Sequence, residues 1–199
     1  MVVLDAAHGG ADAGAHGATG VVESEVVLSL ARLARFELER QGLRVVMTRQ
    51  GNENPSFDER SATANAQRGA IFISLHVSST GPAGTARVYS VAMRSGALSA
   101  AQPSLLPWDQ AQEPYAESSR RLAELVQIQL AQKFRGSPEV PSAAPVRQLR
   151  TVAAPAIAIE FSSVAVQDRS QLDAMGPALA EAVARAVATF RPFYEEGAK

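Results

Sequence analysis

The chain has 199 residues, of which 46% are hydrophobic, and this is enough for a single domain with one substantial core. Its 19 lysines and arginines nearly balance its 20 aspartates and glutamates, so no strong field would attract nucleic acid or an anionic membrane. The absence of cysteine excludes a disulfide framework, a thiolate zinc site and a cysteine nucleophile, which leaves histidine and carboxylate groups to hold any metal ion.

The N-terminal part of the chain predicts two steps of strand followed by helix. Residues 2–5 predict a short buried strand that leads into a glycine-rich loop. Apolar residues at helical spacing predict a helix over residues 24–41, which Gly42 ends. Residues 44–49 predict the next strand. A helix is predicted over residues 56–68, because residues 56–59 have the pattern of a capping box.

The middle of the chain adds two strands and one irregular segment. Residues 70–76 are almost continuously apolar, as in a central strand that is covered on both faces. Residues 87–92 predict another strand after the turn at Gly81 and Pro82. Residues 94–116, which contain the only tryptophan, sustain no period, and we interpret them as an inserted lobe.

The C-terminal part returns to regular patterns. Helical spacing predicts a helix over residues 118–134, and residues 146–149 are assigned to an edge strand. Residues 155–161 predict a buried strand, and residues 172–194 predict a closing helix. The alternation of strands and helices predicts a single α/β domain with a mostly parallel, twisted sheet of about six strands and helices on both faces.

Polar side chains stand where three of these strands end. His8 follows the first strand, His76 closes the strand over residues 70–76, and Glu160 closes the last long strand. Active sites of open α/β sheets gather outside the carboxyl ends of the strands. Glu23 lies where the loop from His8 returns to the sheet, so all four side chains are expected to converge.

Two histidines and one carboxylate leave a fourth coordination position open, which is typical of catalytic zinc and not of structural zinc. A second carboxylate beside such an ion can accept a proton from the attacking water. This combination predicts metal-assisted hydrolysis. The inserted lobe is expected near the mouth of the site, where Trp108 and Tyr115 would form a substrate-contacting flap.

The residues by themselves leave other roles open. Either histidine could be bound by backbone groups at its strand end, and Glu160 could pair with Arg150. Glu23 and Glu25 are both candidates for the carboxylate ligand. His16 lies in a glycine-rich segment without apolar neighbours, so we assign it to solvent or to a substrate contact.

Three blocks of the sequence resemble the zinc-dependent N-acetylmuramoyl-L-alanine amidases of the type 3 class, which are cell-wall hydrolases. The first block opens at Val3 with Val-Leu-Asp-Ala-Ala-His-Gly-Gly and closes with Glu-Ser-Glu-Val-Val-Leu from Glu23. The second block covers residues 59–76 and the third covers residues 155–161. The blocks follow the family's order over nearly the whole chain.

The resemblance implies zinc ligands at His8, Glu23 and His76. It also implies that Glu160 is the catalytic group that activates the water, and it favours Glu23 over Glu25 because the family's ligand comes first in this acidic segment. The implied reaction is hydrolysis of the amide bond between N-acetylmuramic acid and L-alanine in peptidoglycan. Some family members carry an inhibitory helix at about the place of residues 94–116, so the resemblance adds an inhibitory role as the alternative to a flap. The implied location is periplasmic or extracellular, although residues 1–5 are too short for a signal peptide and no apolar run approaches the roughly 20 residues of a membrane span.

Three segments at the rim of the expected site depart from the family's pattern. Ala6 and Ala7 replace the usual proline and glycine, and residues 77–79 and 161–163 also differ. Two alternatives therefore stay open: an amidase-like module that binds peptidoglycan without turnover, and a zinc peptidase that acts on stem peptides. A nucleotide-binding protein is disfavoured, since the glycines lack the GxGxxG order and no P-loop lysine is present.

Overall fold

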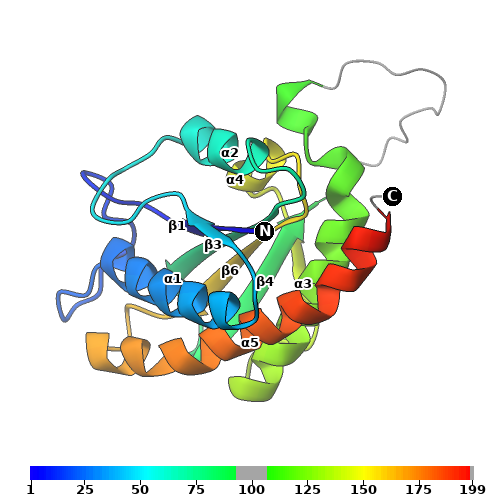
Figure 1. Ribbon diagram of the computed structural model, residues 1–199. Helices are drawn as coiled ribbons and strands as arrows, with labels where there is room; N and C mark the ends of the chain where they lie inside the picture. The colour runs from blue at the N-terminus through cyan, green and yellow to red at the C-terminus, as the bar shows by residue number, and fades with distance from the viewer. Residues whose placement is uncertain (93–106, 198–199) are drawn as a thin grey trace.

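The computed structural model describes residues 1–92 and 107–197, and it has one six-stranded sheet in the order β2-β1-β3-β6-β4-β5 (Figure 1). The strands are β1 (Val2–Ala6), β2 (Val45–Met47), β3 (Ile71–Ser78), β4 (Thr85–Val91), β5 (Ser142–Ala144) and β6 (Ala156–Ser162). The first three strands and β6 are parallel, β4 is antiparallel to β6, and β5 is parallel to β4. The prediction of a mostly parallel sheet is confirmed.

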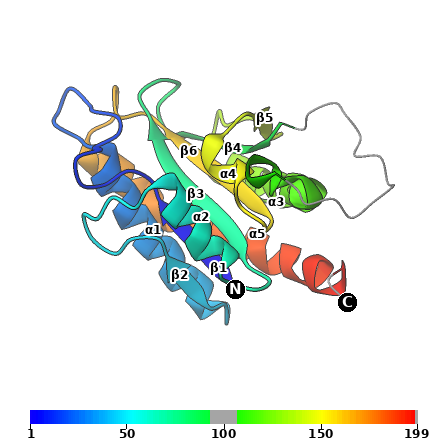
Figure 2. The same ribbon diagram turned by 90° about the horizontal axis from the view of Figure 1, so that it is seen from above.

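Helices cover both faces of this sheet, as predicted (Figure 2). The α-helices of the described residues are α1 (Glu23–Arg40), α2 (Phe57–Asn65), α3 (Ala116–Lys133), α4 (Arg147–Arg150) and α5 (Arg169–Gly197). The larger core lies between the sheet and α1, α3 and α5, whereas α2 and α4 enclose a smaller core on the opposite face. None of the helices in the described ranges combines the length and the apolar character that a membrane crossing requires.

The alternation of side chains along β3 decides which face carries the polar groups. Ile73 and Leu75 enter the larger core, whereas Phe72 enters the smaller core beneath α2 and α4. Ser74 and His76 share the face of Phe72, because every second residue of a strand points to the same side. The candidate site therefore lies on the α2 and α4 face of the sheet.

The capping box predicted for α2 is present. The Ser56 hydroxyl accepts a hydrogen bond from the Glu59 amide at 3.3 Å, and the Glu59 carboxylate accepts one from the Ser56 amide at 2.7 Å. These two bonds satisfy amide groups at the start of the helix that no helical carbonyl can reach.

The prediction of an edge strand over residues 146–149 is wrong. Residues 147–150 form the short helix α4, and the edge strand is β5, which pairs with β4. Val146 and Leu149 are three residues apart, a spacing that also fits one turn of helix, and the fully buried Leu149 packs in the smaller core. The Ser-Ala-Ala sequence of β5 has low strand propensity, so the apolar pattern of the sequence does not reveal this strand.

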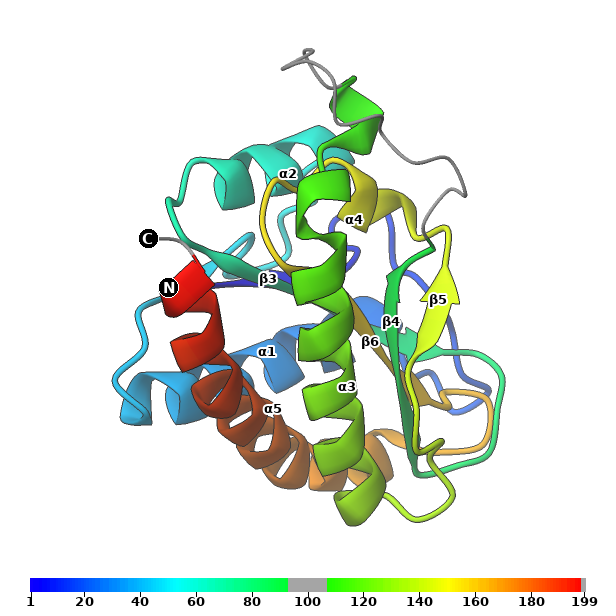
Figure 3. The same cartoon turned by 90° about the vertical axis from the view of Figure 1, so that its right-hand side faces the viewer.

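Residues 94–116, which the sequence analysis interprets as an inserted lobe, follow β4 in the chain. β4 runs antiparallel to β1, β3 and β6. The carboxyl end of β4 therefore lies at the opposite end of the sheet from the carboxyl ends of those three strands. Residues 94–106 lie outside the described residues. The remainder forms two short turns of 3-10 helix, η1 (Trp108–Gln110) and η2 (Glu113–Tyr115), which precede α3 (Figure 3). These turns border a pocket that Val91 and Arg150 also line, and this pocket is separate from the one at His8 and His76.

Candidate functional site

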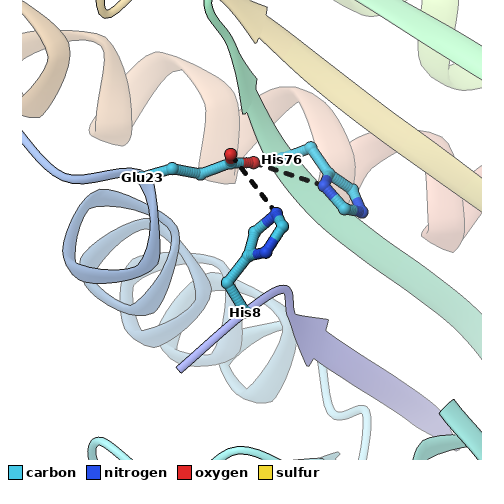
Figure 4. A group of neighbouring side chains, drawn as sticks. All are labelled: His8, Glu23 and His76. Carbon is cyan, nitrogen blue, oxygen red and sulfur yellow. Dashed lines mark hydrogen bonds and ion pairs between the residues drawn. The ribbon is translucent and has the colours of Figure 1, made fainter. Parts of the chain in front are cut away.

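The side chains of His8, Glu23 and His76 meet at the carboxyl ends of β1 and β3 (Figure 4). His8 follows β1, Glu23 is the first residue of α1, and His76 lies in β3. Each offers one ligand atom, and these atoms lie within 4.8 Å of one another. His8 Nε2 is 3.3 Å from Glu23 Oε2, and His76 Nδ1 is 3.3 Å from Glu23 Oε1. Two imidazole nitrogens and one carboxylate oxygen are a donor set that fits a catalytic zinc ion.

The structure distinguishes the two acidic residues at the start of α1. The Glu23 side chain is 6% exposed and lies between the two histidines, whereas the Glu25 side chain is 68% exposed and pairs with Arg169 at 3.3 Å. Glu25 is thus a surface charge in the first helical turn, where the helix dipole favours it. His16 is also exposed, and its backbone forms an isolated bridge with Val22.

Hydrogen bonds stabilise the ionised form of the Glu23 carboxyl group. Burial by itself raises its pKa, but hydrogen bonds from His76, His8 and the amides of Ala15 and Val77 outweigh burial and lower the pKa well below its ordinary value. The hydrogen bond to Glu23 raises the pKa of His8 to about 9, against the opposing effect of burial. A cation that binds here would compete with the proton on the His8 ring.

Two buried arginines, Arg49 and Arg60, hold the loop that carries His8. Arg49 donates to the carbonyl oxygens of Ala7 at 2.9 Å and Ser24 at 2.7 Å, and thereby ties the His8 loop to the start of α1. Arg60 donates to the carbonyl oxygen of His8 at 2.9 Å. His8 itself has φ 61°, a left-handed conformation that is uncommon for a residue other than glycine and that these bonds support.

Sequence reasoning did not single out the neighbours of the two imidazole rings. Asp12 Oδ2 lies 2.9 Å from His8 Nδ1, and Ser74 Oγ lies 3.2 Å from His76 Nε2. Asp12 lies four residues after His8 in a loop, and Ser74 stands two residues before His76 in an apolar run. The contact between Ser74 and His76 could have been predicted, because residues two apart on one strand place their side chains on the same face.

Glu160 stands beside the three-residue cluster. It is the register partner of His76 on the neighbouring parallel strand β6, and it shares the face of Ala158 in the smaller core. Its Oε2 accepts a hydrogen bond from the Tyr89 hydroxyl at 2.9 Å. Burial and then this bond raise the pKa of Tyr89, so the phenol keeps its proton and donates it. The alternative partner Arg150 instead borders the pocket beside residues 107–116.

A pocket opens over the two histidines. Its walls come from the His8 loop, from the segment before α2, from α2 and from α4, and they include Phe57, Arg60 and Gln148. Phe57 is 48% exposed, so an apolar ring is available to a substrate next to the polar groups. The arrangement places a candidate metal site and an open binding surface together.

Gly14 packs directly against two of the candidate ligands, and this contact yields a prediction. It has φ 70°, and a Cβ at this position would lie 2.6 Å from Glu23 Oε2 and 2.7 Å from His8 Cδ2. We expect Gly14→Ala to push these side chains apart and to weaken zinc binding by at least about tenfold, the lower end of the effect of losing a supporting group. Competition with a chelator measures the change.

Gly20 provides the matched control for this substitution. It lies in the same loop with φ 80°, but an added Cβ would meet nothing within 4 Å. Gly20→Ala therefore introduces similar backbone strain without the clash. Equal losses of zinc affinity in the two variants would contradict the role assigned to Gly14.

Comparison with known proteins points to one family. A family model described as N-acetylmuramoyl-L-alanine amidase matches residues 2–189. The amidase AmiC of Neisseria meningitidis serogroup B is 40% identical over 76 residues, which are 38% of this chain and 18% of that protein. AmiC of Escherichia coli O6:H1 is 34% identical over 106 residues, which are 51% of this chain and 25% of that protein. The matched part of the chain thus spans a quarter or less of these relatives.

Solved structures show the same fold. N-acetylmuramoyl-L-alanine amidase AmiC2 of Nostoc punctiforme superposes with a TM-score of 0.75 at 24% identity, and 96% of each chain is covered. The amidase of Clostridium difficile 630 gives a TM-score of 0.73 at 21% identity, again over 96% of each chain. The family match over nearly the whole sequence confirms the resemblance seen in its three blocks: the chain belongs to the N-acetylmuramoyl-L-alanine amidase family, in its type 3 class.

Proposed function

We propose that this protein hydrolyses the amide bond between N-acetylmuramic acid and the L-alanine of the peptidoglycan stem peptide, with one zinc ion held by His8, Glu23 and His76. Membership of the amidase family supports the choice of reaction. The observation that supports metal dependence is the meeting of two imidazoles and one carboxylate within 4.8 Å, next to a pocket that His8 and His76 line. The substrate lies outside the cytoplasmic membrane, so the proposed location is periplasmic or extracellular.

Different side chains of the protein have different roles in the proposed reaction. When bound, a zinc ion supplies a Lewis acid that polarises the scissile carbonyl and lowers the pKa of water to about 7. Glu160 accepts the proton of the attacking water and then delivers it to the nitrogen of L-alanine as the bond breaks. The Tyr89 hydroxyl keeps the Glu160 carboxylate in place through its 2.9 Å hydrogen bond.

Digestion of purified peptidoglycan tests the proposal. The native protein is assayed with zinc and after removal of metal by a chelator, and mass spectrometry identifies the products. We expect zinc-dependent release of peptides that begin with a free L-alanine amino group. A peptidase would instead leave L-alanine on muramic acid, and zinc binding without any product would identify a peptidoglycan-binding module.

A further inference from the structure

We infer that Arg87 is a specificity-determining residue, whose guanidinium binds a carboxylate on the stem-peptide residue that follows L-alanine. The inference rests on the proposed function and names a substrate group that this chain selects. It starts from the strand β4, which lies beside β6 (Figure 3) and which enters the proposed reaction so far only through Tyr89.

Strand register places Arg87 directly opposite the proposed catalytic residue. Arg87 of β4 and Glu160 of β6 are partners in the antiparallel pair. Opposite residues of such a pair project from the same face of the sheet, with Cβ atoms about 5 Å apart. The alternation along β4 agrees, because Tyr89 packs against the smaller core whereas Val88 enters the larger one. Arg87 therefore stands on the same face as Glu160, which is the face of the candidate site.

The Arg87 side chain is exposed, and within residues 1–92 and 107–197 it forms no ion pair with a carboxylate. It contacts the Tyr89 hydroxyl, which in turn donates to Glu160 at 2.9 Å. Burial is the largest cause of the raised pKa of Tyr89, and the charge of Arg87 and a hydrogen bond from its guanidinium oppose that rise. The positive charge thus lies one side chain away from Glu160 and remains available to a ligand.

The other arginines around the site have different partners. Arg49 and Arg60 are buried, and Arg49 donates to backbone carbonyl groups whereas Arg60 pairs with a buried aspartate at 2.6 Å. Arg147 lies over the ring of Phe57, with 4.8 Å between the guanidinium carbon and the ring centroid. Among these arginines, Arg87 is the one whose register places it opposite the proposed proton-transfer group.

The chemistry of the substrate indicates which group this guanidinium would bind. The carboxyl group of muramic acid is part of the scissile amide, so the free carboxylates lie on the peptide side of the bond. Glu160 is proposed to protonate the nitrogen of L-alanine, and a peptide advances at most about 3.6 Å per residue. A carboxylate on the next residue is therefore within about 7 Å of that nitrogen. Guanidinium and carboxylate form charge-assisted, bidentate pairs, which distinguish a carboxylate from its amide.

Two muropeptides that differ in one group test the inference. The residue after L-alanine carries a free carboxylate in one and the corresponding carboxamide in the other, and kcat and KM are measured for release of the peptide. We expect the native protein to prefer the carboxylate substrate. In Arg87→Gln the ratio of the two kcat/KM values should fall by about 10- to 100-fold, the effect of losing a hydrogen bond to a charged group. The change should appear mainly in KM, since the carboxylate takes no part in the reaction itself.

Two further variants make the kinetic test specific. Arg44 is an exposed arginine next to β2, the strand at the far edge of the sheet, so Arg44→Gln is the matched control and should keep the native preference. Arg87→Lys should keep part of the preference, because an ammonium group retains the charge but not the bidentate geometry. Equal losses of kcat/KM on both substrates in Arg87→Gln, or a native protein without preference, would overturn the inference.

Binding of the reaction products separates this inference from the proposed function. NMR titration gives the affinity of the native and Arg87→Gln proteins for the two free stem peptides, and circular dichroism verifies folding of the variant. Tighter binding of the carboxylate peptide by the native protein, but not by Arg87→Gln, would support the inference even if neither muropeptide were hydrolysed, a result that would refute the proposed function. Equal affinity of the native protein for both peptides would refute the role of Arg87.

Discussion

Replacing His76 with alanine is expected to remove zinc from the purified protein and to abolish hydrolysis of peptidoglycan. The substitution leaves one imidazole and one carboxylate, and two ligands do not make the three-residue set of a catalytic zinc site. The expected loss of zinc affinity exceeds about 100-fold, the upper end of the effect of removing a supporting partner. Elemental analysis of the native and substituted proteins measures the zinc content, and circular dichroism verifies folding.

The third histidine of the chain supplies the control. His16 is exposed and lies outside the cluster of ligand atoms, so His16→Ala changes the histidine content without touching the proposed site. It should retain native zinc content and activity. Equal zinc in the native protein and in His76→Ala would show that the ligand assignment is wrong.

Glu160→Gln is expected to keep zinc and fold while turnover falls by about 100-fold or more, the scale on which acid–base groups contribute to catalysis. An amide has nearly the shape of a carboxyl group, and its oxygen can still accept the hydrogen bond from Tyr89. It cannot take a proton from water or return one to the leaving amine. Turnover is measured as release of stem peptides beginning with L-alanine, together with the zinc content of each protein.

Glu25→Gln is the matched control for this experiment. It makes the same chemical change at an exposed carboxylate in the first turn of α1, two residues from a proposed ligand. Its turnover should equal that of the native protein. Native-like activity of Glu160→Gln would refute the proton-transfer role, whereas equal losses in both variants would point to a general effect of charge.

The errors of the sequence-based prediction have identifiable physical causes. Residues 146–149 contain the apolar Val146 and Leu149 but form the helix α4, whereas the edge strand β5 pairs through a Ser-Ala-Ala segment whose side chains give no strand pattern. The apolar pattern of β4 also says nothing about the direction in which this strand runs. Only residues 79–84 connect β3 to β4, and this link is too short for the crossover that a parallel strand requires. That direction decides at which end of the sheet the chain leaves β4.

By itself the sequence determined the α/β class, the alternation that builds a mostly parallel sheet, the family, and the polar groups at the strand ends. These features are local, because apolar runs, capping boxes and family motifs each depend on residues that are close together in the sequence. His8, His76 and Glu160 were candidates for this reason, because each stands at or near the end of an apolar run in the sequence.

Only the tertiary structure showed which of these side chains lie next to one another. Strand register places Asp5 beside Ser74 and His76 beside Glu160, and a slip of one residue would turn these side chains to the opposite face. The hydrogen bond between Asp5 and Ser74 joins residues 69 positions apart. Choosing Glu23 by geometry required the same information, since burial between two histidines is a property of the packed loop and helix. Such contacts arise from packing between distant segments, and no spacing within one segment encodes them.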